Sequence, residues 1–196
     1  LHWMGRSETW RVATDEERIL RAKRDELQLH AERRRQVLNM IEALLARYWP
    51  ELTAHLALTT VTLVRLLATF GGPADVARNA EEARRLLRKV GSAFKPETLD
   101  AVIACAEDSC GVAMLDAERA YLMSLAKEVL EARTKAKQAE AGLVAAGAEK
   151  VPKTMSKMLG MVTACVLIAS NLDPRRYDSP QAYRKALGLN LRESSS

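Results

Sequence analysis

Apolar residues recur at heptad spacing over residues 14–49, the first long stretch of the chain. Thr14 and Glu17 have the spacing of a capping box, which marks the start of a helix, and Pro50 marks its end. The pattern predicts one long helix of a coiled-coil stalk. Seven of its nine seam positions are apolar: Leu20, Arg24, Leu27, Ala31, Arg34, Leu38, Ile41, Leu45 and Tyr48.

A second heptad pattern covers residues 112–147 and predicts another long helix. Its seam changes from larger apolar residues to alanine: Leu115, Leu122, Leu125, Val129, Ala132, Ala136, Ala139 and Leu143. The simplest arrangement packs this helix antiparallel to the first one as a stalk. Association of the stalk into a homo-oligomer is the alternative, and the heptads fit both.

Shorter helical patterns, separated by Gly and Pro, fill residues 50–111. They predict helices over 59–70, 79–91 and 96–108 and a single turn over 73–78, with Asn79 and Glu82 as a capping pair. The carboxylates of this small helical region fall at scattered spacings. We therefore expect no catalytic constellation there.

Together these patterns predict an all-α fold. Two long coiled-coil-like helices enclose the small helical domain in the sequence, and a helix-hairpin-helix-like domain follows over residues 148–196. Residues 1–13 give no clear element. A low aromatic content of 5%, with many Leu, Ala, Arg and Glu residues, also favours long helices.

Several features indicate a soluble, cytoplasmic protein without a membrane partner. The longest uncharged stretch, residues 158–172, is shorter than the roughly 20 residues of a membrane span. The first residues do not have the pattern of a signal peptide. Cys105, Cys110 and Cys165 lack metal-ligand spacing, which predicts buried, reduced thiols rather than a metal site.

The positive charge of the chain is concentrated in its last quarter. Residues 150–196 hold eight Lys or Arg and three Asp or Glu, whereas the first 149 residues hold 22 of each kind. Clustered positive charge of this kind is typical of a surface that binds a phosphate-rich partner. A solvated basic surface is the alternative that charge alone leaves open.

A glycine turn lies within this basic segment and predicts a helical hairpin. Gly160, followed by Thr163, has the pattern of a helix-hairpin-helix element, although Met158 stands where the usual hairpin has its first glycine. Such a hairpin directs backbone N–H groups at phosphate oxygens without reading the bases. We expect phosphate contacts from Lys153 and Lys157; a helix pair bent at a glycine, with an apolar core, is the structural alternative.

The stretch LGMVTACVLIASNLDPRRYDSPQAYRKALGLNLRESSS resembles the C-terminal domain of insertion-sequence family one-ten transposases. These are bridge-RNA-guided recombinases related to Piv-type DNA invertases. The resemblance rests on an ordered series of residues: Gly160, Thr163, Asp173, Pro174, Tyr177, Ser179, Tyr183, Gly188, Leu189 and the terminal serines. It implies DNA as a partner, and a guide RNA as well.

The resemblance also implies a site. The family's nucleophilic serine precedes a glycine, and Ser196 is the best candidate here, with Ser195 and Ser194 as alternatives. DNA-backbone contacts would come from the lysines and glycine turn of the hairpin and from Arg175, Arg176 and Arg192.

In family members a ribonuclease-H-like domain with an acidic Mg²⁺ site comes before the helical region. We find no strand-rich stretch of that kind, and residues 1–13 would be its trailing edge. A serine hydroxyl needs a base or a metal environment to become a nucleophile. The full-length protein would therefore be a transposase or recombinase with Mg²⁺, and we expect this chain alone, which has no cofactor site, to be inactive.

Two further interpretations belong to other classes. The chain could be a non-catalytic helical module that binds nucleic acid, with the serine triplet as a frayed tail. It could also be a coiled-coil assembly module, which would have no affinity for nucleic acid.

Overall fold

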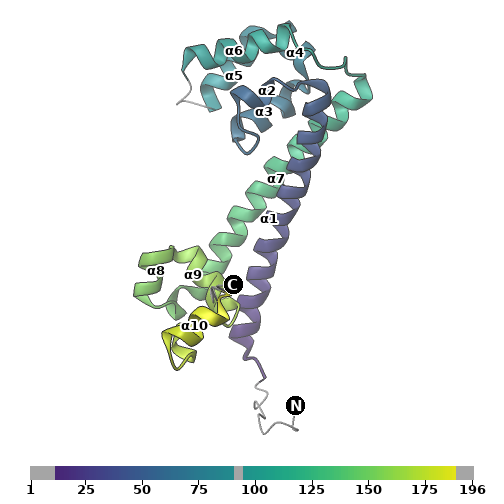
Figure 1. The fold of residues 1–196 in the computed structure, drawn as a ribbon. Helices are drawn as coiled ribbons and strands as arrows, with labels where there is room; N and C mark the ends of the chain where they lie inside the picture. Colours follow the sequence, from purple (N-terminus) through teal and green to yellow (C-terminus); the bar gives the residue numbers. More distant parts are fainter. Residues whose placement is uncertain (1–11, 91–94, 189–196) are drawn as a thin grey trace, which may run out of the picture. The chain divides into compact units, whose positions relative to one another are not determined.

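The computed structural model describes residues 12–90 and 95–188, and this part of the chain consists of helices joined by turns, without strands (Figure 1). The predicted all-α fold is confirmed, including its two long helices and the helical hairpin near the C-terminus. Ser194, Ser195, Ser196 and Arg192 lie outside the described residues.

The first long helix, α1 (Asp15–Tyr48), begins at the predicted capping box. The backbone N–H of Glu17 donates to Oγ1 of Thr14 at 3.3 Å, and the N–H of Thr14 donates to Oε2 of Glu17 at 3.0 Å. Both orphan N–H groups are thereby satisfied by local contacts, which is why the start of the helix can be located from the sequence.

The second long helix, α7 (Asp116–Gly147), begins later than the pattern that starts at residue 112. The N–H of Val112 donates to the carbonyl of Arg47 at 3.0 Å, which holds this segment in a loop against the end of α1. The carboxylate of Glu118 then accepts the N–H of Leu115 at 2.9 Å and caps the new helix. Because of this non-local contact, α7 begins later in the sequence than the heptad pattern predicts.

The described residues divide into two compact units, and α1 and α7 each contribute to both. The inserted unit spans residues 29–136, and the terminal unit combines the residues up to 28 with those from 137 onward. In each unit the two long helices are antiparallel. Tyr48 contacts Glu118 and Arg33 contacts Glu128 in the inserted unit, and the side chain of Lys23 comes close to Gly142 in the terminal unit.

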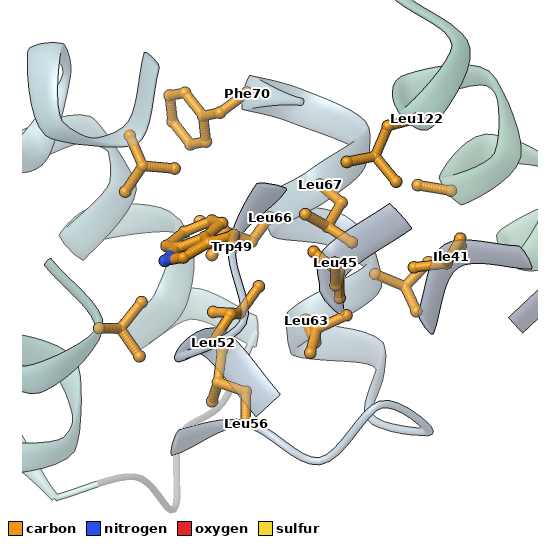
Figure 2. Close-up of a cluster of buried hydrophobic side chains, with 14 of the residues drawn as sticks. Ile41, Leu45, Trp49, Leu52, Leu56, Leu63, Leu66, Leu67, Phe70 and Leu122 are labelled. Carbon is orange, nitrogen blue, oxygen red and sulfur yellow. The ribbon is translucent and has the colours of Figure 1, made fainter. Parts of the chain in front are cut away.

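The inserted unit contains the short helices α2 (Leu52–His55), α3 (Val61–Phe70), α4 (Pro73–Arg78), α5 (Ala80–Val90) and α6 (Pro96–Glu107). Its core surrounds Trp49, whose side chain is fully buried (Figure 2). The indole Nε1–H donates to the carbonyl of Cys105 at 3.2 Å, so the buried polar atom is satisfied. Leu52, Leu66 and Phe70 belong to the same apolar cluster.

The terminal unit contains the 3₁₀ turns η2 (Ala148–Lys150) and η3 (Pro174–Arg176) and the helices α8 (Lys153–Leu159), α9 (Met161–Ala169) and α10 (Pro180–Ala186). Its small core combines residues from both ends of the chain: Leu20, Leu143, Val151, Met155, Ala164, Cys165 and Ala169. A Cβ on Gly147 would lie 3.0 Å from Cδ2 of Leu20 and 3.1 Å from Sγ of Cys165, so glycine permits this close approach.

Two expectations about side chains are corrected. The α1 seam is buried at Leu20 and again from Leu38 onward, whereas Ala31 and Arg34 are exposed, so the heptad does not form a continuous buried stripe. Of the three thiols only that of Cys165 is buried. Cys110 is exposed because it lies in the loop before α7, outside the core.

No single described helix is long and apolar enough to cross a membrane. Only the bent pair of Lys153–Leu159 with Met161–Arg176 reaches the required length and composition, when its two parts are counted together.

Candidate nucleic-acid interface

Gly160 forms the turn between α8 and α9. Its φ of 79° and ψ of 155° fall in a region that essentially only glycine adopts. Its N–H donates to the carbonyl of Ser156 at 2.9 Å and its carbonyl accepts the N–H of Ala164 at 3.1 Å, so one residue ends α8 and begins α9. The chain direction changes by 118° between the two helical segments.

The beginning of α9 is open. No side chain caps its first turn, and a Cβ built on Gly160 would have no atom within 4 Å. Thr163, in this first turn, is exposed. Uncapped N–H groups at a helix N-terminus carry partial positive charge, which favours an anion nearby.

Lys153 and Lys157 lie one turn apart on α8, and both are exposed. Within the described part of the chain neither forms an ion pair or a side-chain hydrogen bond. Residues 153–169 contain no Asp or Glu. The positive charge of this hairpin is therefore not compensated from within its own helices.

Arg175 has a different environment. Its guanidinium contacts both carboxylate oxygens of Asp173, at 2.7 Å from Nη2 and 2.9 Å from Nε, and Nη2 also donates to the carbonyl of Lys150 at 2.9 Å. The hydrogen bonds from Arg175, partly opposed by burial, lower the pKa of the Asp173 carboxyl. The same carboxylate caps η3 by accepting the N–H of Arg175.

Arg176 and Lys150 are also paired. Arg176 donates to Glu17 at 2.7 Å, and Lys150 donates to Glu16 at 2.6 Å. We call residues 173–177 the basic turn. These contacts join the basic turn and η2 to the first turn of α1, so the two arginines predicted to bind phosphate hold the terminal unit together instead of standing free.

An open cavity of about 340 Å³ lies beside these ion pairs. Its charged lining residues include three acids and three bases: Glu16, Glu17, Asp173, Lys150, Arg175 and Arg176. Because the charges balance and are already paired, the cavity offers an anion no excess positive charge. The hairpin, rather than the cavity, is therefore the stronger anion-binding candidate.

Sequence reasoning missed two features of this surface. Arg184 and Lys185 lie in the last turn of α10, and both are exposed. The helix itself begins where Ser179 accepts the N–H of Ala182 at 3.2 Å, a cap visible in the sequence. The other missed feature is Met158, whose exposure could not be foreseen because apolar residues are usually assigned to the core.

Among the described residues, no group of three or more His, Cys, Asp or Glu side chains is placed to hold a metal ion. The Mg²⁺ site that the resemblance implies would belong to the preceding domain of a full-length family member, not to the residues described. Comparisons with protein-family models, with curated proteins and with solved structures find no match to this chain.

Proposed function

We propose that this chain is part of a DNA transposase or site-specific recombinase, and that its α8–α9 hairpin binds the phosphate backbone of DNA. The observation that carries the proposal is the pair of exposed lysines on α8, Lys153 and Lys157, which form no ion pair within the described residues, together with the uncapped N-terminus of α9. Ammonium groups and helical N–H groups together make a contact surface that recognises phosphate but not base sequence. A guide RNA would offer the same phosphates.

The distribution of charge supports DNA over a neutral partner. Besides Lys153 and Lys157, the terminal unit carries two more exposed cations, Arg184 and Lys185 on α10. They form no ion pair in the described part of the terminal unit. An exposed cation gains little from a single surface ion pair, but several cations along a polyanion release condensed counterions. We therefore assign Arg175 and Arg176 to positioning of the hairpin and the lysines to phosphate contact.

The catalytic part of the proposal rests on the resemblance alone. Ser196, or Ser195 or Ser194, would attack a DNA phosphate in the full-length protein with the help of the acidic metal domain. Ser194, Ser195 and Ser196 lie outside the described residues, and we derive no catalytic step for them. In this proposal the chain alone binds DNA and does not exchange strands.

The test is a titration of a short labelled DNA duplex, followed by fluorescence anisotropy between about 50 and 200 mM salt. The Lys153→Ala/Lys157→Ala variant should bind more weakly, with a logarithmic salt slope smaller by about 2, because two phosphate contacts are lost. Lys127→Ala/Lys135→Ala, two exposed lysines of α7, makes the same change in net charge and should retain the slope.

Binding that is equally weakened by the two double variants would overturn the assignment of the hairpin. Absence of salt-sensitive binding by the unmodified chain would overturn DNA binding altogether and favour a coiled-coil assembly module. Equal affinity for duplexes of unrelated sequence is the expected result, because phosphate contacts carry no base information.

A further inference from the structure

The tip of the hairpin is apolar and faces solvent. The Met158 side chain is 83% exposed, more than any other large apolar side chain in the described part of the chain, and Leu159 and Met161 on either side of Gly160 are 46% and 36% exposed. Together these three side chains form what we call the apolar tip. Contiguous exposed apolar patches of a few hundred Å² or more mark interaction surfaces, and these three residues are close neighbours in the sequence.

The residues of the apolar tip are not among the core residues of the terminal unit. Met155 and Val151 are the residues of this segment that enter the core with Cys165 and Ala164. Met158 is not part of that cluster, and the atoms near the turn leave open space above Gly160. Met158 is therefore available to a partner without any change in the packing of the hairpin.

The charges around the apolar tip indicate what that partner is. Lys157 immediately precedes Met158, Lys153 lies one turn earlier, and residues 150–172 contain no Asp or Glu. A second copy of this surface would bring lysines toward lysines, which is unfavourable. A polyanion with an apolar interior fits better. Double-stranded DNA has this character, because stacked bases lie between two rows of phosphates.

We propose that Met158 inserts between neighbouring base pairs when the hairpin binds DNA. This inference rests on the proposed function: Lys153 and Lys157 hold the phosphates, and the methionine acts as a wedge. Side chains of this type inserted at a base step unstack it and kink the duplex. Methionine suits the role because it is unbranched, flexible and polarizable.

Insertion of Met158 would make the hairpin prefer some DNA duplexes over others, which phosphate contacts alone cannot do. Unstacking costs least at pyrimidine–purine steps and at mismatched positions. The ligand class is therefore a duplex with an easily deformed or already unstacked position. We expect such a duplex to bind roughly tenfold more tightly than a fully paired, stiff one of equal length.

The experiment uses duplexes with the fluorescent base 2-aminopurine beside a single mismatch or a TA step. Its fluorescence rises when the base loses its stacking neighbour. The unmodified chain should raise the fluorescence and prefer the deformable duplex. Met158→Ala should remove both effects and keep the salt slope of binding, because alanine shortens the side chain without disturbing a helix. Met40→Ala, at another exposed methionine, should behave like the unmodified chain.

The possible outcomes distinguish failure of the Met158 wedge from failure of DNA binding by the hairpin. Salt-sensitive DNA binding without a change in 2-aminopurine fluorescence would overturn the wedge and leave the proposed function standing. No DNA binding at all would overturn both. Parallel measurements with anionic phospholipid vesicles and by analytical ultracentrifugation complete the test. Binding to vesicles, or self-association, that depends on Met158 while DNA stacking is unaffected would overturn the wedge and assign the apolar tip to that partner.

Discussion

Nη2 of Arg176 lies 2.7 Å from Oε1 of Glu17, although 159 positions separate the two residues in the sequence. Glu17 also accepts the N–H of Thr14 and so completes the capping box of α1. One carboxylate therefore begins the first helix and fastens the basic turn. The guanidinium of Arg176 is thus paired with a carboxylate within the terminal unit.

A double-mutant cycle of Glu17→Gln and Arg176→Gln should measure this contact. At position 17 glutamine keeps the size of the side chain and the capping hydrogen bond; at position 176 it removes the charge and shortens the side chain. We expect a coupling of about 0.5–1 kcal/mol in the free energy of unfolding, at the upper end for partly exposed pairs, because the Glu17 side chain is only 17% exposed. The coupling should shrink in high salt.

The control for this cycle is the exposed pair of Arg18 and Asp15, whose side chains are 72% and 90% exposed. Its coupling should be close to zero, since surface pairs contribute little. Urea unfolding followed by circular dichroism gives both values. Equal coupling energies for the two pairs would contradict a specific role for Arg176 in holding the basic turn.

Substitution of Gly160 by alanine should destabilise the protein by about 1–3 kcal/mol through backbone strain alone. Its φ of 79° and ψ of 155° are disfavoured for any residue with a Cβ, whereas the new methyl group would meet no atom within 4 Å. Gly142→Ala is the matched control. In α7 a Cβ would come no closer than 3.6 Å to the side chain of Lys23, and alanine should stabilise the helix by about 0.5–1 kcal/mol. The two changes should therefore have opposite signs in thermal unfolding.

Gly111→Ala should destabilise the inserted unit by at least about 2 kcal/mol, because its Cβ would clash with the backbone carbonyl of Tyr48. That backbone cannot move without disturbing the end of α1. Gly72→Ala provides the comparison: its Cβ would meet Sδ of Met114 at 2.7 Å, and this flexible side chain can turn away. If Gly72→Ala proved as costly as Gly111→Ala in urea unfolding, rigid backbone would not be the cause.

The stability of the inserted unit should depend on pH through Glu51. The carboxylate of Glu51 accepts the N–H of Cys110 at 2.8 Å and the hydroxyl of Ser109 at 2.9 Å. The hydrogen bonds between Cys110 and Glu51 make the largest contribution to lowering the pKa of Glu51 from its ordinary 4.5 to about 2. Because the folded pKa is the lower one, the stabilisation is complete above pH 4.5 and is lost as the pH falls toward 2.

Glu51→Gln should therefore be less stable than the unmodified chain near neutral pH, and the difference should vanish near pH 2. Urea midpoints measured across this range give the result, and a difference that stays constant with pH would refute it. A second readout is the thiol of Cys110, whose pKa is raised chiefly by its hydrogen bond with Glu51. The variant should alkylate faster at Cys110, while the buried Cys165 should remain slow.

The helices could be predicted because their signals are local. The capping box of Thr14 and Glu17, the Ser179–Pro180 start of α10 and the Gly160 turn all lie within a few residues of the structures they specify. The delayed start of α7 could not be predicted, because it depends on the contact of Val112 with Arg47.

The candidate site could be predicted only in part, because some of its features depend on contacts between residues far apart in the sequence. Residue type and position identify Lys153 and Lys157 as cations near a glycine turn, and neither is paired with any of the residues that the structure describes. Nothing near Arg176 in the sequence indicates that Glu17 will neutralise it. Nor does the apolar character of Met158 indicate solvent exposure, since that depends on which neighbours the hairpin lacks.

The terminal unit is assembled from two segments that leave the ribosome at very different times. Its helical turns around Leu20 are synthesised early, but their partners Leu143 and Cys165 follow only after the whole inserted unit. Domains tend to fold as they emerge from the ribosome. The inserted unit can therefore fold first, while the apolar side chains around Leu20 stay exposed until residues 137 onward have been synthesised. The Glu17–Arg176 contact can therefore form only after the whole inserted unit has been synthesised.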